Sequence, residues 1–144
     1  MTRRTLSAGG MTVELSLDGG RLCAVDLPAE PPPDFDAEAL AELTRELGAL
    51  PLALESFAPF TRAALEGMRK IPIGSALTYR ELAHAIGNPR AIRAIGNACA
   101  RNRLLLVVPC HRVLAESGLG GFRLGLAWKC KLLELECELA AGVA

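Results

Sequence analysis

Hydrophobic and polar positions alternate near the start of the chain, a pattern typical of β-strands that bury one face. Residues 12–17 carry an apolar side chain at every second position, and residues 22–27 are largely apolar. An Asp-Gly-Gly turn at 18–20 lies between the two runs, so together they predict a β-hairpin. A proline-rich break at 28–33 follows, and the spacing over 37–47 then predicts a helix.

The rest of the chain has mainly helical spacing, interrupted by short breaks. A break at 51–56 precedes a predicted helix over 57–69. The continuous apolar run 104–108 predicts a buried strand that ends just before Cys110, and 126–139 predict a terminal helix. The inward-facing positions expected for this last helix are Leu126, Cys130, Leu133 and Cys137.

A helix-turn-helix motif is predicted in the middle of the chain. Thr78 and Glu81 have the spacing of a capping box, so a helix begins between them. Gly87 ends this helix, and Asn88 is expected to cap a second helix over 89–101, with proline at its first position. Two short helices joined by a tight turn are typical of DNA-binding motifs.

The second of these helices has one polar, basic face. At about 100° per residue, Ile92, Ile95 and Cys99 fall on one side. The residues expected on the opposite, DNA-contacting side are Arg90, Arg93, Asn97 and Arg101. Small Ala and Gly residues fill the positions between, so the backbone can approach a polyanion. We therefore favour a nucleic-acid contact over an ordinary surface helix with solvated arginines.

Composition excludes several classes of protein. With 51% apolar and 22% charged residues, the chain is neither disordered nor collagen-like. Its longest apolar run, 104–109, is far shorter than the ~20 residues of a membrane span. No apolar stretch follows Arg3 and Arg4, as it would in a signal peptide. We expect a globular protein without a membrane partner.

The net charge of zero argues against a nucleic-acid partner until it is divided along the chain. Residues 1–60 contain four basic and ten acidic side chains, whereas residues 61–112 contain nine and two. The zero is thus a cancellation between an acidic first part and a strongly basic middle. The basic part coincides with the predicted helix-turn-helix.

The five cysteines, without a Cys-x-x-Cys pair, argue against a disulfide framework and against zinc. We expect reduced thiols, a cytoplasmic location and no metal site. Four of them lie in apolar patterns and are interpreted as small core residues: Cys23, Cys99, Cys130 and Cys137.

Cys110 is the candidate nucleophile. A His and an Arg follow it directly, and neighbouring positive charge lowers the pKa of a thiol and populates the reactive thiolate. His111 is expected to reach the thiol only through a turn or a bridging water, because adjacent strand residues point to opposite faces. From these residues alone, an inert buried cysteine and a cysteine hydrolase that uses His84 or His111 both stay open.

Five ordered segments resemble one known family. They are Ile71-Pro72-x-Gly74, Thr78-Tyr79-x-Glu81-Leu82-Ala83, Gly87-Asn88-Pro89-x-Ala91-x-Arg93-Ala94-x-Gly96, Arg101-Asn102 and Pro109-Cys110-His111-Arg112-Val113. Together they resemble the C-terminal domain of the O6-alkylguanine-DNA alkyltransferases, the methylated-DNA–protein-cysteine methyltransferases, over about residues 54–137. The first 50 residues match only loosely.

The resemblance implies roles for the matching residues. Cys110 matches the acceptor that takes the alkyl group from guanine O6, and His111 the residue that draws the thiol proton through a water. Glu136 matches the carboxylate that orients this histidine, although without the family it would be interpreted as a solvated glutamate. Tyr79 matches the hydroxyl that helps rotate the target phosphate and protonates the departing guanine, and Asn102 the brace of the active-site turns.

The resemblance also implies how the base is held. Arg93 matches the side chain that enters the duplex in place of the flipped base. The residues expected in the base pocket are Val113, Cys99, Phe122 and Arg112. The loop 119–124 is about one residue shorter than in some members and carries Phe122-Arg123 where others have Tyr-Ser, a difference that bears on the size of the alkyl group accepted.

These observations predict an α/β (α+β) chain, with a small β-hairpin-plus-helix domain at 1–53 and a winged helix-turn-helix-like alkyltransferase domain at 54–144. The implied function is DNA repair by irreversible, single-turnover transfer of a methyl or alkyl group from O6-alkylguanine in double-stranded DNA to Cys110, after base flipping. O4-alkylthymine stays open as a second substrate. We expect a monomer that uses no cofactor.

Two further alternatives belong to other functional classes. The first is a non-enzymatic alkyltransferase-like protein that only binds the lesion, and the thiol of Cys110 argues against it because such proteins replace the acceptor cysteine. The second is a winged-helix regulator, which would bind DNA sequence-specifically whether or not Cys110 is present.

Overall fold

The chain begins with an antiparallel three-stranded sheet in the computed structural model, which describes residues 1–142. The strands are β1 (Thr2–Ala8), β2 (Met11–Asp18) and β3 (Arg21–Asp26), in the order β1-β2-β3. Gly19 and Gly20 connect β2 to β3 with φ of 60° and 81°, the left-handed values that a two-residue hairpin turn needs. The predicted hairpin is confirmed, as part of a larger sheet.

β1 is a strand that the hydrophobic pattern did not predict. It pairs with β2 at the edge of the sheet, and its residues 2–5 are exposed, while Leu6 is half-buried and Ala8 is buried. An edge strand with so little covered surface does not need alternating apolar residues. Its Thr-Arg-Arg-Thr start therefore resembles a polar terminus in the sequence.

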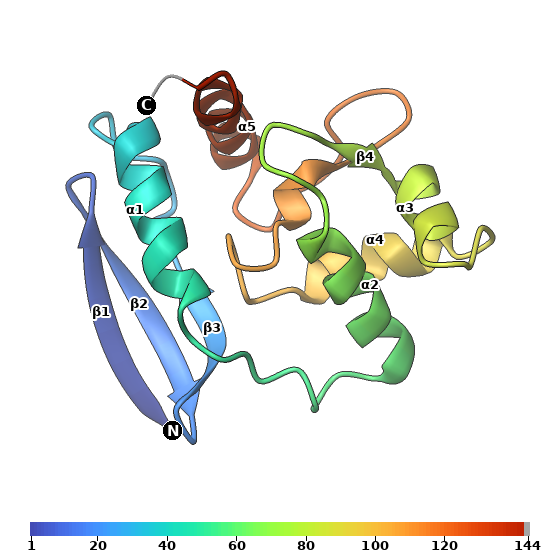
Figure 1. Ribbon diagram of the computed structural model, residues 1–144, viewed down its shortest axis with the longest axis horizontal. Coiled ribbons are helices and arrows are strands. Elements are labelled where there is room, and N and C mark those ends of the chain that lie inside the picture. Colours follow the sequence, from blue (N-terminus) through green and yellow to red (C-terminus); the bar gives the residue numbers. More distant parts are fainter. Residues whose placement is uncertain (143–144) are drawn as a thin grey trace.

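Helix α1 (Ala37–Gly48) lies beside the sheet (Figure 1) and confirms the helix predicted over 37–47. Asp36 caps its N-terminus, since Oδ1 accepts a hydrogen bond from the Ala39 amide at 2.9 Å. The larger side chains that the sheet and α1 bury together are Val13, Leu15, Leu17, Leu22, Val25, Leu40, Leu43 and Leu47.

The second part of the chain is mainly helical and carries a small parallel pairing. Its elements are α2 (Pro59–Arg69), β4 (Leu77–Thr78), α3 (Tyr79–Ala85), α4 (Ile92–Arg101), the 3-10 helix η1 (Cys110–Arg112), β5 (Val113–Leu114) and α5 (Leu126–Ala140). β4 pairs with β5, with Leu77 opposite Val113. This pairing places the start of α3 beside the segment that follows Cys110. The predicted α+β class is confirmed.

The helix-turn-helix forms as predicted at its first helix and differs at its second. The Thr78 hydroxyl accepts from the Glu81 amide at 3.1 Å, and the Glu81 carboxylate accepts from the Thr78 amide at 2.8 Å, which completes the capping box. The second helix starts at Ile92, not at residue 89. The carbonyl of Asn88 accepts from the Ala91 amide at 3.0 Å, so Asn88 begins a turn and does not cap the helix.

The prediction of a strand over 104–108 is wrong in conformation, although most of these residues are buried as expected. Residues 102–109 form a turn, in which Leu106 has a φ of 72° and the Val108 amide donates to the Leu104 carbonyl at 2.9 Å. A left-handed leucine is uncommon and breaks any strand. The backbone of this turn is satisfied by bonds within the turn, by the Asn102 side chain and by the Val25 amide of β3.

Helix α5 confirms the helix predicted over 126–139 but turns a different face inward. Leu126, Cys130 and Cys137 are exposed. The buried residues are Trp128, Lys129, Leu132, Leu135 and Glu136. Hydrophobicity alone pointed to the wrong face, because two of the residues on the true buried face are charged.

The expectation of small core cysteines is also corrected outside α5. Cys23 and Cys99 are half-buried, so none of the four cysteines assigned to the core is fully buried, whereas Cys110 is 4% exposed.

Contacts of Trp128 and of Val25 are among those that join the sheet half to the helical half. The Trp128 indole donates to the Pro28 carbonyl at 2.7 Å, and its ring packs edge-on against Phe35 with centroids 5.5 Å apart. The Val25 amide of β3 donates to the Arg103 carbonyl at 2.9 Å. The sheet thus supports the turn that leads to Cys110. Within residues 1–142, every helix is too short or too polar to cross a membrane.

Candidate active site

Cys110 lies at the first position of η1, with its thiol held by Asn102. The Asn102 side-chain amide donates to the Cys110 Sγ at 3.2 Å and to the Val108 carbonyl at 3.0 Å, while its oxygen accepts from the Leu104 amide at 2.9 Å. One fully buried asparagine therefore shapes the turn and fixes the thiol at its end. The predicted strand geometry, with Cys110 and His111 on opposite faces, is replaced by a 3-10 turn.

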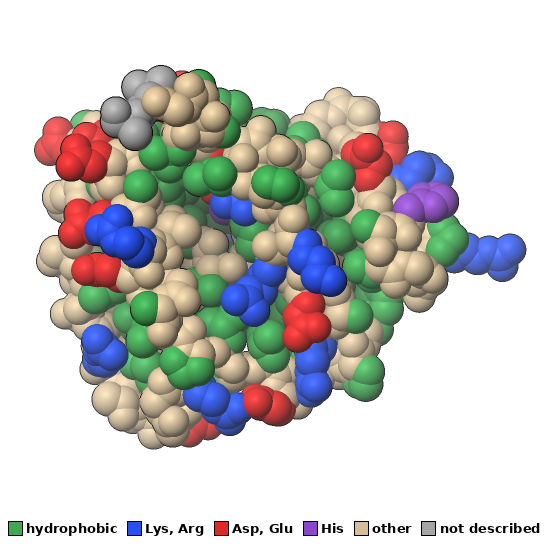
Figure 2. All heavy atoms as spheres, viewed as in Figure 1, with side chains coloured by type: hydrophobic (Ala, Val, Ile, Leu, Met, Phe, Trp, Pro, Cys, Tyr) green, Lys and Arg blue, Asp and Glu red, His purple; other side chains and the backbone are tan. Residues whose placement is uncertain are grey.

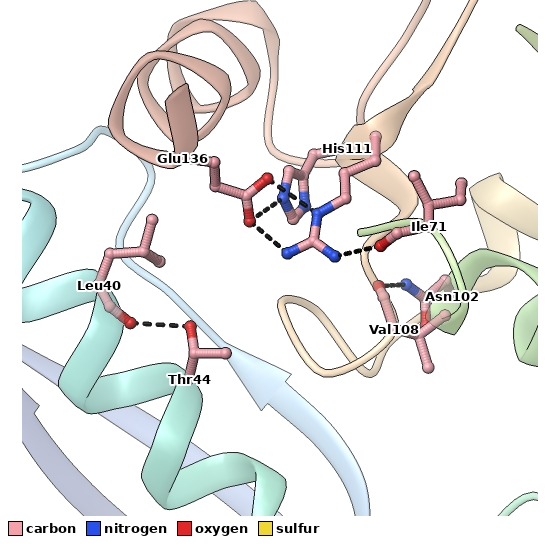
Figure 3. Close-up of polar contacts among 8 residues, drawn as sticks. Leu40, Thr44, Ile71, Asn102, Val108, His111 and Glu136 are labelled. Carbon is pink, nitrogen blue, oxygen red and sulfur yellow. Dashed lines mark hydrogen bonds and ion pairs between the residues drawn. The ribbon is translucent and has the colours of Figure 1, made fainter. Parts of the chain in front are cut away.

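The two residues after Cys110, His111 and Arg112, form a buried charged cluster with Glu136. Figure 3 shows His111 and Glu136 pointing toward one another. Arg112 donates to both carboxylate oxygens of Glu136, at 2.8 and 2.6 Å, and to the Ile71 carbonyl at 2.7 Å. The His111 Nε2 lies 3.0 Å from Glu136 Oε2. A guanidinium fork of this kind fixes the orientation of a carboxylate. Glu136 is thus held between the two residues that follow Cys110.

Opposing effects set the ionisation of Glu136. Burial favours the neutral acid, but the hydrogen bonds and charge of Arg112 and the close contact with His111 outweigh it and lower the pKa of Glu136 to about 2. The carboxylate is therefore ionised at neutral pH. Both ring nitrogens of His111 are buried without a hydrogen bond of regular geometry within residues 1–142: Nε2 has its close contact with Glu136, and Nδ1 has no polar partner.

The thiol of Cys110 is neutral at rest. Burial raises its pKa, while the hydrogen bond from Asn102 and the positive charges of Lys129 and Arg123 act in the opposite direction with a smaller effect. The expected lowering of the pKa by adjacent basic residues is therefore not found, because Arg112 points to Glu136 and burial dominates. A base must take the proton before this sulfur can attack.

Lys129 on α5 is fully buried and connects the two sides of the site. Its ammonium group donates to the Val113 carbonyl at 2.8 Å, just after η1, and to the Gly121 carbonyl at 3.0 Å, in the loop before α5. The pattern of apolar residues did not single out this lysine. Its place directly after Trp128, in an otherwise largely apolar part of α5, was the sequence signal that could have indicated a buried lysine.

A cavity of about 260 Å³ opens in front of Cys110. Its lining residues are Tyr79, Gly96, Cys99, Ala100, Cys110, Gly121, Phe122 and Arg123. Burial raises the pKa of Tyr79, so this hydroxyl keeps its proton, and burial raises the pKa of Cys99 to about 12. Gly120 approaches Tyr79 so closely that an added Cβ would lie 3.2 Å from the hydroxyl oxygen.

The structure brings together some of the expected pocket residues and places others elsewhere. Tyr79, Cys99 and Phe122 line the cavity with Cys110, and the Phe122 ring lies edge-on to His111 with centroids 6.3 Å apart. Arg112 binds Glu136 behind the thiol, and Val113 is fully buried with its carbonyl on Lys129. The lining by Gly96, Ala100 and Gly121 was not expected from the sequence, which pointed to Arg123 only through the loop 119–124.

The basic residues assigned to DNA contact are all exposed. Arg93, Asn97 and Arg101 follow one another at four-residue intervals along α4, and Arg90 lies in the turn before it. The opposite side of α4 buries Ile95 and Ala98. Gly96, Cys99 and Ala100 of the same helix line the cavity, so the basic face and the cavity belong to one helix. In Figure 2, basic side chains also lie over α2, whereas acidic ones gather over α1.

Comparison with known proteins identifies the family. The profile of the 6-O-methylguanine DNA methyltransferase DNA-binding domain matches residues 59–138, which include Tyr79, α4, the Cys110 turn and Glu136. The chain belongs to this family. The match contains both the cavity and the charged cluster behind it.

Curated relatives of the family are similar over the same region. Over 90 residues the chain is 43% identical to the Escherichia coli bifunctional transcriptional activator/DNA repair enzyme Ada, covering 62% of this chain and 25% of Ada. Over 78 residues it is 45% identical to a probable methylated-DNA–protein-cysteine methyltransferase of Acanthamoeba polyphaga mimivirus, covering 54% of this chain and 52% of the viral protein. The similar segment is therefore about half of the viral protein and a quarter of Ada.

Solved structures of the family are similar over nearly the whole chain. The Mycobacterium tuberculosis OGT, crystallised in complex with DNA, superposes with a TM-score of 0.74 at 29% identity and covers 94% of this chain and 92% of its own. The O6-methylguanine-DNA methyltransferase of Pyrococcus kodakaraensis superposes with a TM-score of 0.67 at 26% identity, with coverage of 93% and 97%. The likeness thus extends beyond the family profile into the N-terminal sheet.

Proposed function

We propose that the protein repairs DNA by transferring a methyl or other alkyl group from O6-alkylguanine to Cys110, once per molecule. One observation carries this proposal. The buried Cys110 thiol lies at the wall of a cavity, and helix α4, which lines the same cavity, also carries the exposed basic face. A lesion that is turned out of the duplex at α4 enters that cavity and meets the sulfur. The curated relatives named as methylated-DNA–protein-cysteine methyltransferases support the same activity.

In the proposed chemistry, His111 removes the proton of the Cys110 thiol. Its buried Nδ1, which has no partner within residues 1–142, is suited to bind an ordered water that relays this proton. The ionised Glu136 stabilises the imidazolium that forms, and Arg112 keeps the carboxylate in place. The thiolate then attacks the alkyl carbon, a sulfur–carbon bond forms and the carbon–O6 bond breaks.

Tyr79 is proposed to supply the proton to the departing guanine. Its pKa is raised by burial and its ring lines the cavity, so it is a protonated donor beside the leaving group. The thioether formed on Cys110 does not hydrolyse readily. The protein is therefore both reagent and final product, and the reaction needs no cofactor.

Duplex DNA is the proposed partner, with α4 as the element that contacts it. Arg90, Arg93, Asn97 and Arg101 contact the DNA, with Arg93 filling the gap left by the flipped base at a cost of a few kcal/mol for unstacking. The family structure crystallised with DNA supports this assignment. The free thiols fit a reducing compartment, the cytoplasm, and we propose that the protein acts as a monomer.

The test is a single-turnover reaction with a duplex oligonucleotide that contains one O6-methylguanine. We expect the intact protein to gain about 14 Da, one methyl group on Cys110, and Cys110→Ser to gain nothing. Cys130→Ser, a matched change at an exposed cysteine, should react normally. Tight binding of the lesion without a mass increase in the folded protein would contradict the proposal and favour a protein that only binds the lesion. Repeated turnover of an ester would instead favour a cysteine hydrolase.

A further inference from the structure

Arg123 gives the cavity a positive charge. Among the cavity-lining residues within 1–142, it is the one with a formally charged side chain; the others are small, aromatic or thiol-bearing. Its guanidinium is one of the charges that act on the Cys110 thiol. A group bound in front of Cys110 is therefore exposed to a positive field from one side of the cavity.

The position of Arg123 is defined by a hydrogen bond across the cavity. The Nη1 atom donates to the Ala100 carbonyl of α4 at 3.1 Å, so the loop before α5 is tied to the helix that carries the basic face. A guanidinium has five N–H donors in a rigid fork. The bond to Ala100 uses one of them, and the others can bind a second acceptor.

Carboxylates of the neighbouring segments are paired with other arginines. Glu116, after β5, lies 3.2 Å from Arg80, and Glu136 is held by Arg112 behind the thiol. Lys129 adds a second positive charge beneath the loop through its bond to the Gly121 carbonyl. The charge of Arg123 is thus not offset by an acidic side chain lining the cavity.

Building on the proposed function, we propose that Arg123 makes this site selective for O6-alkyl groups that end in a carboxylate. The geometry supports a carboxylate, because a rigid fork of N–H donors binds two carboxylate oxygens better than any neutral group. A small alkyl group such as methyl offers the guanidinium neither charge nor acceptor. A carboxymethyl group carries its charge one bond beyond the carbon that is attacked.

The charge matters for the reaction as well as for binding. A carboxylate next to the attacked carbon repels the incoming thiolate, and burying it in an apolar cavity costs its hydration. A guanidinium beside it offsets both effects. In the reaction the sulfur–carbon bond forms and the carbon–O6 bond breaks. The electron pair passes to the guanine, which takes a proton, and Cys110 becomes S-carboxymethylcysteine.

The experiment compares two lesions of nearly equal shape in the same duplex, O6-carboxymethylguanine and its neutral amide, O6-carbamoylmethylguanine. Single-turnover transfer rates are measured by intact mass, with O6-methylguanine as the reference. We expect the ratio of the carboxymethyl rate to the carbamoylmethyl rate to fall about fivefold in Arg123→Gln, the scale of a partly exposed ion pair. Arg123→Lys should keep most of the ratio because it keeps the charge.

Taking a ratio removes general effects of the substitution on folding or DNA affinity. Arg45→Gln, the same change at an exposed position of α1, is the control and should leave the ratio unchanged. An unchanged ratio in Arg123→Gln, or an equal loss for all three lesions as for a DNA phosphate contact, would overturn the inference. Failure of the wild-type protein to accept even methyl would instead overturn the proposed function.

Discussion

At the scale of single residues, the site depends on charged side chains that are buried because they satisfy one another. Arg112 and Glu136 share two hydrogen bonds, and Nη1 of Arg112 donates to the Ile71 carbonyl. Removing one partner of such a pair leaves a buried charge without compensation, which costs more than the pair contributes. The cluster therefore holds His111 in place and makes stability depend on pH.

Glu136→Gln should lower the free energy of unfolding at neutral pH by about 3–5 kcal/mol, because Arg112 stays buried and charged. The substitution should also weaken the acid sensitivity. The folded-state pKa of Glu136, about 2, lies below its ordinary value of 4.5. Its contribution is therefore present above about pH 4.5 and is lost as the pH falls towards 2.

Urea unfolding at neutral pH and near pH 3 measures both effects. Glu134→Gln, at an exposed position of the same helix, is the matched control and should change neither the stability nor its pH dependence by more than about 0.5 kcal/mol. Equal acid sensitivity of wild type and Glu136→Gln would show that the cluster does not carry this dependence.

At the scale of elements, α5 supports the candidate active site. It contributes Glu136 to the charged cluster, and about two turns earlier Lys129 holds both the segment after η1 and the loop that lines the cavity. A helix positions side chains more precisely than a loop does. The cavity loop thus takes its position from α5, not from its own sequence.

Lys129→Met should therefore slow alkyl transfer without weakening DNA binding. The methionine keeps the length and bulk of the side chain but leaves two carbonyls without their donor, so the loop shifts relative to Cys110. A displacement of this kind costs about 10- to 100-fold in rate. Single-turnover kinetics with O6-methylguanine and a DNA-binding titration separate the two effects, with Lys131→Met as the control. A loss of affinity with an unchanged rate at saturating DNA would contradict this role.

At the scale of the whole molecule, the sheet half and the helical half depend on each other. Trp128 is fully buried against Phe35 and bonded to Pro28, and β3 binds the Arg103 carbonyl next to Asn102. We therefore propose that residues 1–53 and 54–144 form one folding unit, although the sequence changes character near residue 53.

A chain of residues 54–144 should lose cooperative unfolding, because Trp128 and the apolar residues around it become exposed to water. Thermal unfolding followed by circular dichroism checks this expectation, and alkyl transfer by the same fragment checks its consequence for the site. A sharp transition together with normal transfer would show that residues 1–53 are dispensable.

Local features of the site were predictable from the sequence because they depend on near neighbours. The capping box at Thr78 and Glu81 and the helical pattern of α5 involve residues only a few positions apart. The exposed arginines of α4 follow from helical periodicity in the same way. Cys110 stood out because of the two basic residues that follow it.

The parts that the sequence did not predict depend on partners distant along the chain. The pattern of apolar residues could not predict the turn at 102–109. Its conformation is set by hydrogen bonds of the Asn102 side chain and by the bond between the Arg103 carbonyl and β3. Arg112 was expected in the base pocket, but it binds the carboxylate of Glu136, which lies 24 residues later in the chain. A pairing over such a separation is not visible in a local pattern.

By itself the sequence determined the β2–β3 hairpin, the long helices, the basic helix and the candidate cysteine, since periodicity, capping and adjacent charge are local properties. Only the tertiary structure decided that Lys129 and Glu136 are buried, that the Cys110 thiol is neutral at rest and that Arg123 lines the cavity. The physical reason is that burial of a charge depends on partners brought together by the fold. The chemistry of the site is set by those pairings.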